Sequence, residues 1–295
     1  MMIQAVLGNP HHPEYGVATI PFPIPHDQYA HCMELLETLE IGDAVKADCQ
    51  VQEINSFYSV LKRTEMLTVN VEELNYLAKR LDSFDTGEAA QFQAMAHKLE
   101  LFELKDLINL TFCCQQATVI TDFSDLAVIG RDHYMNLHGG CAKTEELDAL
   151  DGEGTARRLI ESGRGTITPY GVAYDNGMTL EQVYDGRFFP CYYYEPNTIT
   201  VAVTSKSEPE DTAHITWLFL PMVQEEIDRA LLRGGITEPK SAAQIKNLAE
   251  SLDLFDFAPG AHTPEDYGKY MIRQSGHFDY DENLDAFYDY EKYGT

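Results

Sequence analysis

The sequence predicts an α+β protein that is elongated and divided into several small domains with short antiparallel sheets and acidic helices. Three observations predict this class. Short apolar or alternating segments of strand length are interleaved with amphipathic segments of helix length. Turn residues interrupt the 295-residue chain near positions 42, 111, 176 and 240. Acidic side chains are spread from Glu14 to Glu291, among aliphatic and aromatic residues that can fill cores.

The first 110 residues predict a strand-and-helix region followed by a helical middle. Ile3–Leu7 and residues 16–24 have strand character, and the prolines at 21, 23 and 25 confine the second strand to a sheet edge. A helix is expected from His26 to Leu39, because apolar residues recur there at helical spacing. Further elements are expected as a strand over 44–54, a helix capped by Asn70, and helices over 88–99 and 104–110.

The rest of the chain alternates helices with short strands. After an apolar segment at 118–121 and acidic capping residues, we expect helices over 124–136 and 144–150. The glycines and threonines of residues 163–175 predict a hairpin. Later strands are expected over 188–194, 198–203 and 214–220, and later helices over 221–233, over 241–252 and from Thr263 onward.

These elements suggest five units along the chain. They are an N-terminal strand/helix domain over 1–60, a helical domain over 61–110, an acidic α+β domain over 111–175, a strand-rich partial repeat of the N-terminal domain over 176–240, and an acidic helical partial repeat over 241–295.

The charge balance is the strongest functional signal. The chain has 48 Asp and Glu against 21 Lys and Arg, a formal net charge of −27. Such a protein repels nucleic acid and attracts basic surfaces, including the DNA-binding clefts of other proteins. At the charge density of B-DNA, roughly one charge per 1.7 Å, this charge would cover about 46 Å of duplex, or about 13 base pairs. The alternative is an acidic cytoplasmic protein whose charge serves only solubility.

Cysteine use and the N-terminus indicate a reducing cytoplasm. The six cysteines contain no Cys-x-x-Cys pair and are scattered, apart from Cys113-Cys114. We therefore expect mostly buried, unreactive thiols. The first residues lack the basic region and long apolar stretch of a signal peptide, and no apolar run reaches transmembrane length.

An imperfect internal repeat is visible. Leu-Asp-Ala at 147–149 recurs at 284–286, Tyr-Met at 134–135 recurs at 270–271, and Asn-Leu at 109–110 recurs at 247–248, so the offsets are 137, 136 and 138. Residues 19–41 also align with 215–236, with Pro25 on Pro221 and Leu35-Leu36 on Leu231-Leu232. This pattern indicates a duplicated acidic helical unit, and chance is the alternative for either alignment alone.

Several segments together resemble one protein family. They are Thr19-Ile-Pro-Phe-Pro-Ile24 before an acidic helix, Val71-Glu-Glu-Leu-Asn75, Ile120-Thr-Asp122 leading to Gly130-Arg-Asp-His-Tyr134, Gly165-Thr-Ile-Thr-Pro-Tyr-Gly171, Glu265-Asp-Tyr-Gly-Lys-Tyr-Met271 and Leu284-Asp-Ala-Phe-Tyr-Asp-Tyr-Glu-Lys-Tyr-Gly294. In this order they resemble the ArdA antirestriction proteins of plasmids and conjugative elements. The chain departs from that family because it is longer and carries a partial second copy.

The resemblance implies a DNA mimic rather than an enzyme. Family members occupy the DNA-binding groove of type I restriction–modification enzymes and inhibit them, and they form homodimers. The extra copy either extends the mimic or replaces the partner subunit. The candidate phosphate-mimicking carboxylates are Asp122, Asp125, Asp132, Glu145, Glu146, Asp148, Asp151, Glu153, Glu265, Asp266, Asp279, Asp281, Glu282, Asp285, Asp289 and Glu291.

Other chemistry has weaker support in the sequence. His11-His12 is flanked by prolines and has no further ligand at useful spacing, so we expect turn histidines and no metal. His138-Gly-Gly-Cys141 is too isolated to predict a thiol site, and Gly163-Arg-Gly165 is too short for a phosphate loop. We therefore expect no catalytic residues, no cofactor and no direct nucleic-acid binding. The remaining alternatives are an acidic interaction module for another basic DNA-binding protein, such as a histone-like protein, a relaxase or a repressor, and an enzyme without a recognisable signature.

Overall fold

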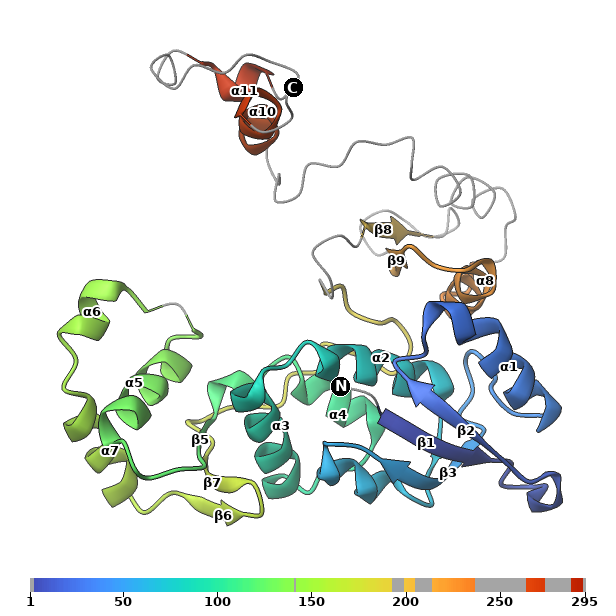
Figure 1. Ribbon diagram of the computed structural model, residues 1–295, viewed down its shortest axis with the longest axis horizontal. Coiled ribbons are helices and arrows are strands. Elements are labelled where there is room, and N and C mark those ends of the chain that lie inside the picture. Colours follow the sequence, from blue (N-terminus) through green and yellow to red (C-terminus); the bar gives the residue numbers. More distant parts are fainter. Residues whose placement is uncertain are drawn as a thin grey trace. The chain divides into compact units, whose positions relative to one another are not determined.

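The computed structural model describes residues 3–140, 142–192, 199–204, 214–236, 264–273 and 288–293. The chain divides into two compact units, Met1–Tyr194 with Thr200–Thr237, and Glu195–Ile199 with Glu238–Thr295. Figure 1 shows short helices and small sheets throughout. The predicted α+β class with short antiparallel sheets is therefore confirmed.

The N-terminal sheet has four strands, β1 (Ile3–Gly8), β2 (Val17–Phe22), β3 (Cys49–Asn55) and β4 (Thr68–Val69), in the order β2-β1-β3-β4. The pairing is antiparallel throughout. As its prolines predict, β2 lies at an edge. The strand expected over 44–54 begins only at Cys49. The preceding loop instead folds around Asp48, which accepts hydrogen bonds from the amides of Gly42 and Asp43.

Four helices cover this region, α1 (Tyr29–Thr38), α2 (Val71–Asp82), α3 (Thr86–Lys98) and α4 (Leu104–Leu110). The cap predicted at Asn70 is present, because its side chain accepts from the amides of Glu72 and Glu73. Asp85 and Glu88 form a reciprocal capping box at the start of α3. These caps satisfy amides that have no partner inside the helix.

One continuous core fills the first 117 residues. It runs from Ile3 through Tyr58 and Phe92 to Ala117, and it also takes in Tyr184 and Tyr192. The core passes through positions 60 and 110, so those two expected boundaries do not separate independent cores. The described Cys32, Cys49, Cys113 and Cys114 are free and buried, as expected. Burial raises the pKa of Cys32 and Cys113, which disfavours their reactive thiolate forms.

The next region contains a three-stranded sheet with a helix pair. Strands β5 (Thr118–Ile120), β6 (Thr166–Thr168) and β7 (Gly171–Tyr174) pair in the order β5-β7-β6. Helices α5 (Leu126–Leu137), α6 (Thr144–Asp148) and α7 (Gly152–Glu161) connect β5 to β6. The hairpin predicted over 163–175 is confirmed, whereas α7 was not expected because Gly152 and Gly154 weaken its helical signal.

The last part of the first unit contains β8 (Ile199–Val203), β9 (Thr216–Leu220) and α8 (Gln224–Arg233). The strand expected over 188–194 is wrong for the described residues 188–192, which form no ladder. Their aromatic rings instead pack on α2, where Phe189 stacks on Tyr76 at 4.4 Å. Helix α8 begins at Gln224, three residues later than expected.

The second unit contains α10 (Pro264–Arg273) and α11 (Tyr290–Tyr293). The start of α10 agrees with the helix expected from Thr263 onward. The helix expected over 241–252 lies outside the described residues. Within the described ranges, no helix has the length and apolar character needed to span a bilayer.

Candidate partner-binding surface

The predicted carboxylates of residues 122–153 gather on α5, α6, α7 and the turns before them. We call α5 and α7 the first helix pair. These helices cross closely at two glycines, since a Cβ atom on Gly130 would lie 1.9 Å from the carbonyl oxygen of Gly152. The pair packs on the sheet through a small core of Ile120, Ile129, Ala156, Leu159 and Tyr174.

Aspartates begin both helices of the first pair. The Asp125 carboxylate accepts from the amides of Ala127 and Val128 at 3.0 and 3.1 Å. The Asp151 carboxylate accepts from the Gly154 amide at 3.0 Å. An acidic side chain at a helix N-terminus satisfies free amides and interacts favourably with the helix dipole. Two of the predicted partner-binding carboxylates therefore also organise the surface that carries them.

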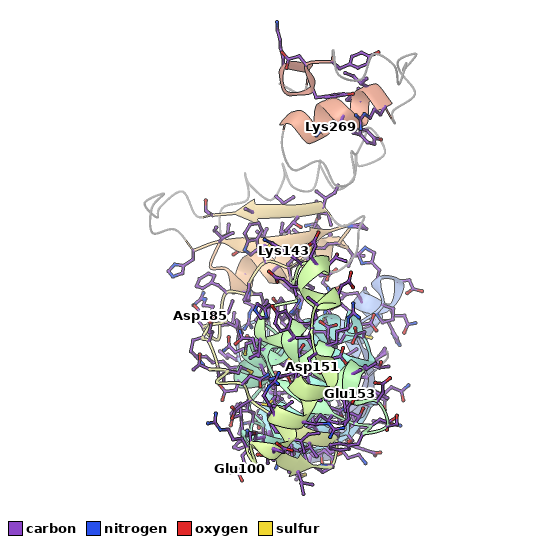
Figure 2. All side chains as sticks on the ribbon, turned by 90° about the vertical axis from the view of Figure 1, so that its left-hand side faces the viewer. Glu100, Lys143, Asp151, Glu153, Asp185 and Lys269 are labelled. Carbon is purple, nitrogen blue, oxygen red and sulfur yellow. The ribbon has the colours of Figure 1, made fainter. Side chains whose placement is uncertain are left out.

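All eight predicted carboxylates in this region are exposed. They are Asp122, Asp125, Asp132, Glu145, Glu146, Asp148, Asp151 and Glu153. Figure 2 shows Asp151 and Glu153 together on α7. A carboxylate exposed on a helix surface is accessible to a basic partner, so the structure agrees with the accessibility that the prediction requires.

Few cations neutralise these carboxylates. Asp148 lies 3.8 Å from Arg131, and Glu153 lies 3.6 Å from Arg157, with all four side chains more than half exposed. Such exposed pairs contribute at most about 1 kcal/mol and are screened by salt. A basic partner can therefore replace these contacts at little cost.

Three of the carboxylates line a groove of about 200 Å³ between β5 and α5. They are Asp122, Asp125 and Asp132, and Val128 and Ile129 supply apolar surface. The Ser124 amide and hydroxyl donate to Asp122 and lower its pKa, which keeps it ionised. Asp132 is exposed as a residue, yet neighbouring atoms desolvate its carboxyl group enough to raise its pKa.

The most acidic part of the N-terminal half lies elsewhere and was not among the predicted sites. Residues 1–60 carry eight acidic side chains against Lys46 alone, whereas residues 121–164 carry nine acidic and five basic side chains. Counting charge segment by segment would have revealed this. The exposed members are Glu14, Asp27, Glu34, Glu37, Glu40, Asp43 and Glu53. The surface of α1 is therefore a second acidic face.

The C-terminal predictions are described only in part. Asp279, Asp281, Glu282 and Asp285 lie outside the described residues. Glu265, Asp266 and Glu291 lie in α10 and α11, but their side chains are outside the described part. Asp289 is exposed, and its carboxylate accepts from the Lys292 amide at 3.2 Å, so it caps α11.

A cluster of charges holds α8 on α2, and the sequence gave no signal for it. Arg229 donates to Glu72 at 2.6 Å, and Lys79 donates to Glu226 at 3.0 Å. An aromatic-lined cavity of about 70 Å³ lies beside these pairs, and Trp217 contributes to its lining. Because these charged groups already have partners, the cluster fixes the position of α8.

The other candidate chemistry finds little support. His11 and His12 lie in a turn around the Asn9 side chain, and His12 contacts Glu14 at 3.0 Å. Across the described ranges, no three His, Cys, Asp or Glu residues are placed to hold a metal ion. Cys141, the candidate thiol, lies outside the described residues.

Comparisons with known proteins found no match: no family model matches this chain, and no curated protein is similar to it.

Proposed function

We propose that this protein is a DNA mimic that occupies the DNA-binding groove of type I restriction–modification enzymes and inhibits them. The observation that carries this proposal is the exposure of all eight carboxylates predicted on the first helix pair and its flanking turns. The net charge of −27 supports it, because such a surface competes with DNA for basic clefts. The sequence resemblance to the ArdA family supplies the enzyme class.

The proposed inhibitor acts by binding, with no catalytic step and no cofactor. The carboxylates take the place of DNA phosphates against the lysines and arginines of the groove. Each exposed contact contributes at most about 1 kcal/mol, so affinity depends on many of them. Because the resemblance implies a homodimer in the cytoplasm, we include both in the proposal.

A competition assay tests this function. Labelled DNA bound to a type I methyltransferase core is titrated with the protein at about 0.1 M and about 1 M salt. The screening length falls from about 10 Å to about 3 Å over this range, so displacement should weaken strongly. Displacement that is independent of salt, or no displacement at either concentration, would count against the proposal.

A charge-matched pair of variants tests whether the predicted surface is responsible. One variant changes Glu145, Glu146 and Glu153 to Gln, and the control changes Glu100, Glu103 and Glu181 to Gln. All six residues are exposed, so both variants lose the same charge. We expect about a tenfold weaker competition from the first variant, or about 1.4 kcal/mol, and less than about threefold from the control. Equal effects would favour general electrostatic attraction over a defined mimic surface.

The alternative function is an acidic interaction module for another basic DNA-binding protein. The same charge and exposure favour it. A histone-like protein tested beside the methyltransferase core separates the two functions. Salt-dependent binding to the histone-like protein alone would select the alternative.

A further inference from the structure

Helices α10 and α11 repeat the first helix pair at one constant spacing. Helix α5 begins at residue 126 and α10 at residue 264, while α7 begins at residue 152 and α11 at residue 290. Both starts are 138 residues apart. We call α10 and α11 the second helix pair.

The close crossing of the helices is repeated at the same spacing. A Cβ atom on Gly130 would lie 1.9 Å from the carbonyl oxygen of Gly152, and a Cβ atom on Gly268 would lie 2.0 Å from that of Tyr290. Both the glycines and the residues they meet are again 138 apart. Few helix pairs approach this closely, because any side chain at the crossing would collide with backbone.

The capping interaction is repeated as well. Asp151 accepts from the amide three residues later at 3.0 Å, and Asp289 accepts from the amide three residues later at 3.2 Å. Each aspartate is followed two residues later by a glutamate, Glu153 and Glu291. Arg131 and Lys269 each follow the crossing glycine. Charge and geometry are therefore repeated together.

The structure also corrects the register of the repeat. At a spacing of 138, Tyr270 corresponds to Asp132, so the Tyr-Met match at 136 does not join equivalent helix positions. In the other repeat, β2 and β9 are each followed directly by proline, which pairs Pro221 with Pro23 rather than Pro25.

The ends of α1 and α8 fix the register of that other repeat. The Ile41 amide donates to the Leu36 carbonyl at 3.1 Å, and the Ile236 amide donates to the Leu231 carbonyl at 2.9 Å. Leu36 therefore corresponds to Leu231, and both are buried. A strand–proline–helix segment thus precedes each helix pair along the chain, so the duplication extends beyond the helix pairs.

We propose that the second helix pair is a second copy of the same binding module, so that one chain presents two equivalent surfaces to basic partners. This inference rests on the proposed function for the nature of the partner. The two copies lie in different compact units of the chain. A chain with two such modules can hold two partner molecules or engage one partner at two places.

Calorimetric titration of the full chain with the type I methyltransferase core tests this inference. One variant combines Asp151→Asn with Glu153→Gln, and its counterpart combines Asp289→Asn with Glu291→Gln. Asparagine caps helices about as well as aspartate, so the charge is removed while the cap is retained. We expect each variant to remove one of two equivalents, or to lower the affinity about tenfold if one partner spans both copies.

The outcomes separate the inference from the function on which it rests. If the counterpart variant binds like the wild type while the first variant is weakened, the second copy is not a binding surface and the proposed function stands. If the wild-type chain binds no partner, the proposed function fails and this inference fails with it.

A structural measurement tests the repeat without any partner. Gly268→Ala should open the second helix pair, because its new methyl group would meet the Tyr290 carbonyl oxygen at 2.0 Å. Hydrogen exchange of the amides of residues 264–273 should accelerate at least tenfold. Unchanged protection would overturn the proposed equivalence of the two helix pairs.

Discussion

The N-terminal core and the first helix pair bury very different amounts of apolar surface. The large core spans three sheet strands, four helices and the aromatic residues Tyr58, Phe92 and Tyr184. The core beneath the helix pair has five buried residues. Small cores give little stability, so the pair depends on its glycine crossing and its caps. The same smallness leaves most of its surface to carboxylates, which suits binding more than stability.

The largest effect is expected in the large core. Phe92 is fully buried and packs edge-on against Tyr58 and Phe84, with ring centroids 6.0 and 6.2 Å away. Phe92→Ala should lower the free energy of unfolding by about 3–5 kcal/mol, because it leaves a cavity. Phe102→Ala is the matched control, since Phe102 is 45% exposed and should cost little. Denaturant unfolding measures both, and equal losses would show that this core is not the main source of stability.

The next effect should be confined to the helix pair. Gly130→Ala forces a methyl group against the Gly152 carbonyl oxygen, and overpacking of this kind costs about 1–3 kcal/mol. Hydrogen exchange should show faster exchange in α5 and α7 and unchanged protection in α3. The control is Gly87→Ala in α3, where the nearest atom is the Asp85 carboxylate at 3.2 Å. Alanine favours helix there, so this variant should be neutral or slightly stabilising. Loss of protection throughout the unit would contradict the independence of the pair.

A smaller effect tests the capping role of a predicted site residue. Asp125→Ala removes the acceptor for two amides at the start of α5 and should cost about 1 kcal/mol. Asp125→Asn keeps the cap and should retain most of that stability while removing the charge. Thermal melts report the cap and the competition assay reports the charge. If both variants were equally stable, the cap would contribute nothing, and Asp125 would matter only through its charge.

Local patterns in the sequence predicted most elements of both regions. Asn70 was expected to cap α2, the prolines of residues 21–25 placed β2 at an edge, and α4 lies at the expected residues 104–110. These features are decided by a few neighbouring residues. Helix α7 was missed because Gly152 and Gly154 weaken its helical signal, although the close crossing requires glycine at 152.

Features decided by distant residues could not be predicted. The contact between Arg229 and Glu72 joins positions 157 residues apart, and neither residue carries a local signal of it. The aromatic residues 188–192 alternate as strand residues do, but they pack on α2 without a strand partner. Exposure of the carboxylates on the helix pair was predictable, since ionised side chains are rarely buried without a partner. Their additional roles as caps became clear only from the geometry.

The smallest effect concerns the junction between the two regions. Lys98 of α3 donates to the Asp175 carboxylate at 2.6 Å, and Asp175 directly follows β7 of the smaller sheet. The Lys98 ammonium group and the Gly177 amide lower the pKa of Asp175 below its usual range. Because Asp175 is about half exposed, solvent screening limits the contribution of this pair to at most about 1 kcal/mol.

The pH dependence of this junction follows from the direction of the pKa shift. A carboxyl group whose pKa is lower in the folded state stabilises that state above its unfolded pKa of about 3.9, and this stabilisation is lost as the pH falls through the lower folded value. Asp175→Asn should therefore be less stable than the wild type at pH 7, and the difference should disappear near pH 2. Unfolding measured at both pH values gives this difference directly. A deficit that persisted at low pH would mean that the Asp175 side chain acts through packing or its hydrogen bond to Gly177, and that charge pairing does not join the two regions.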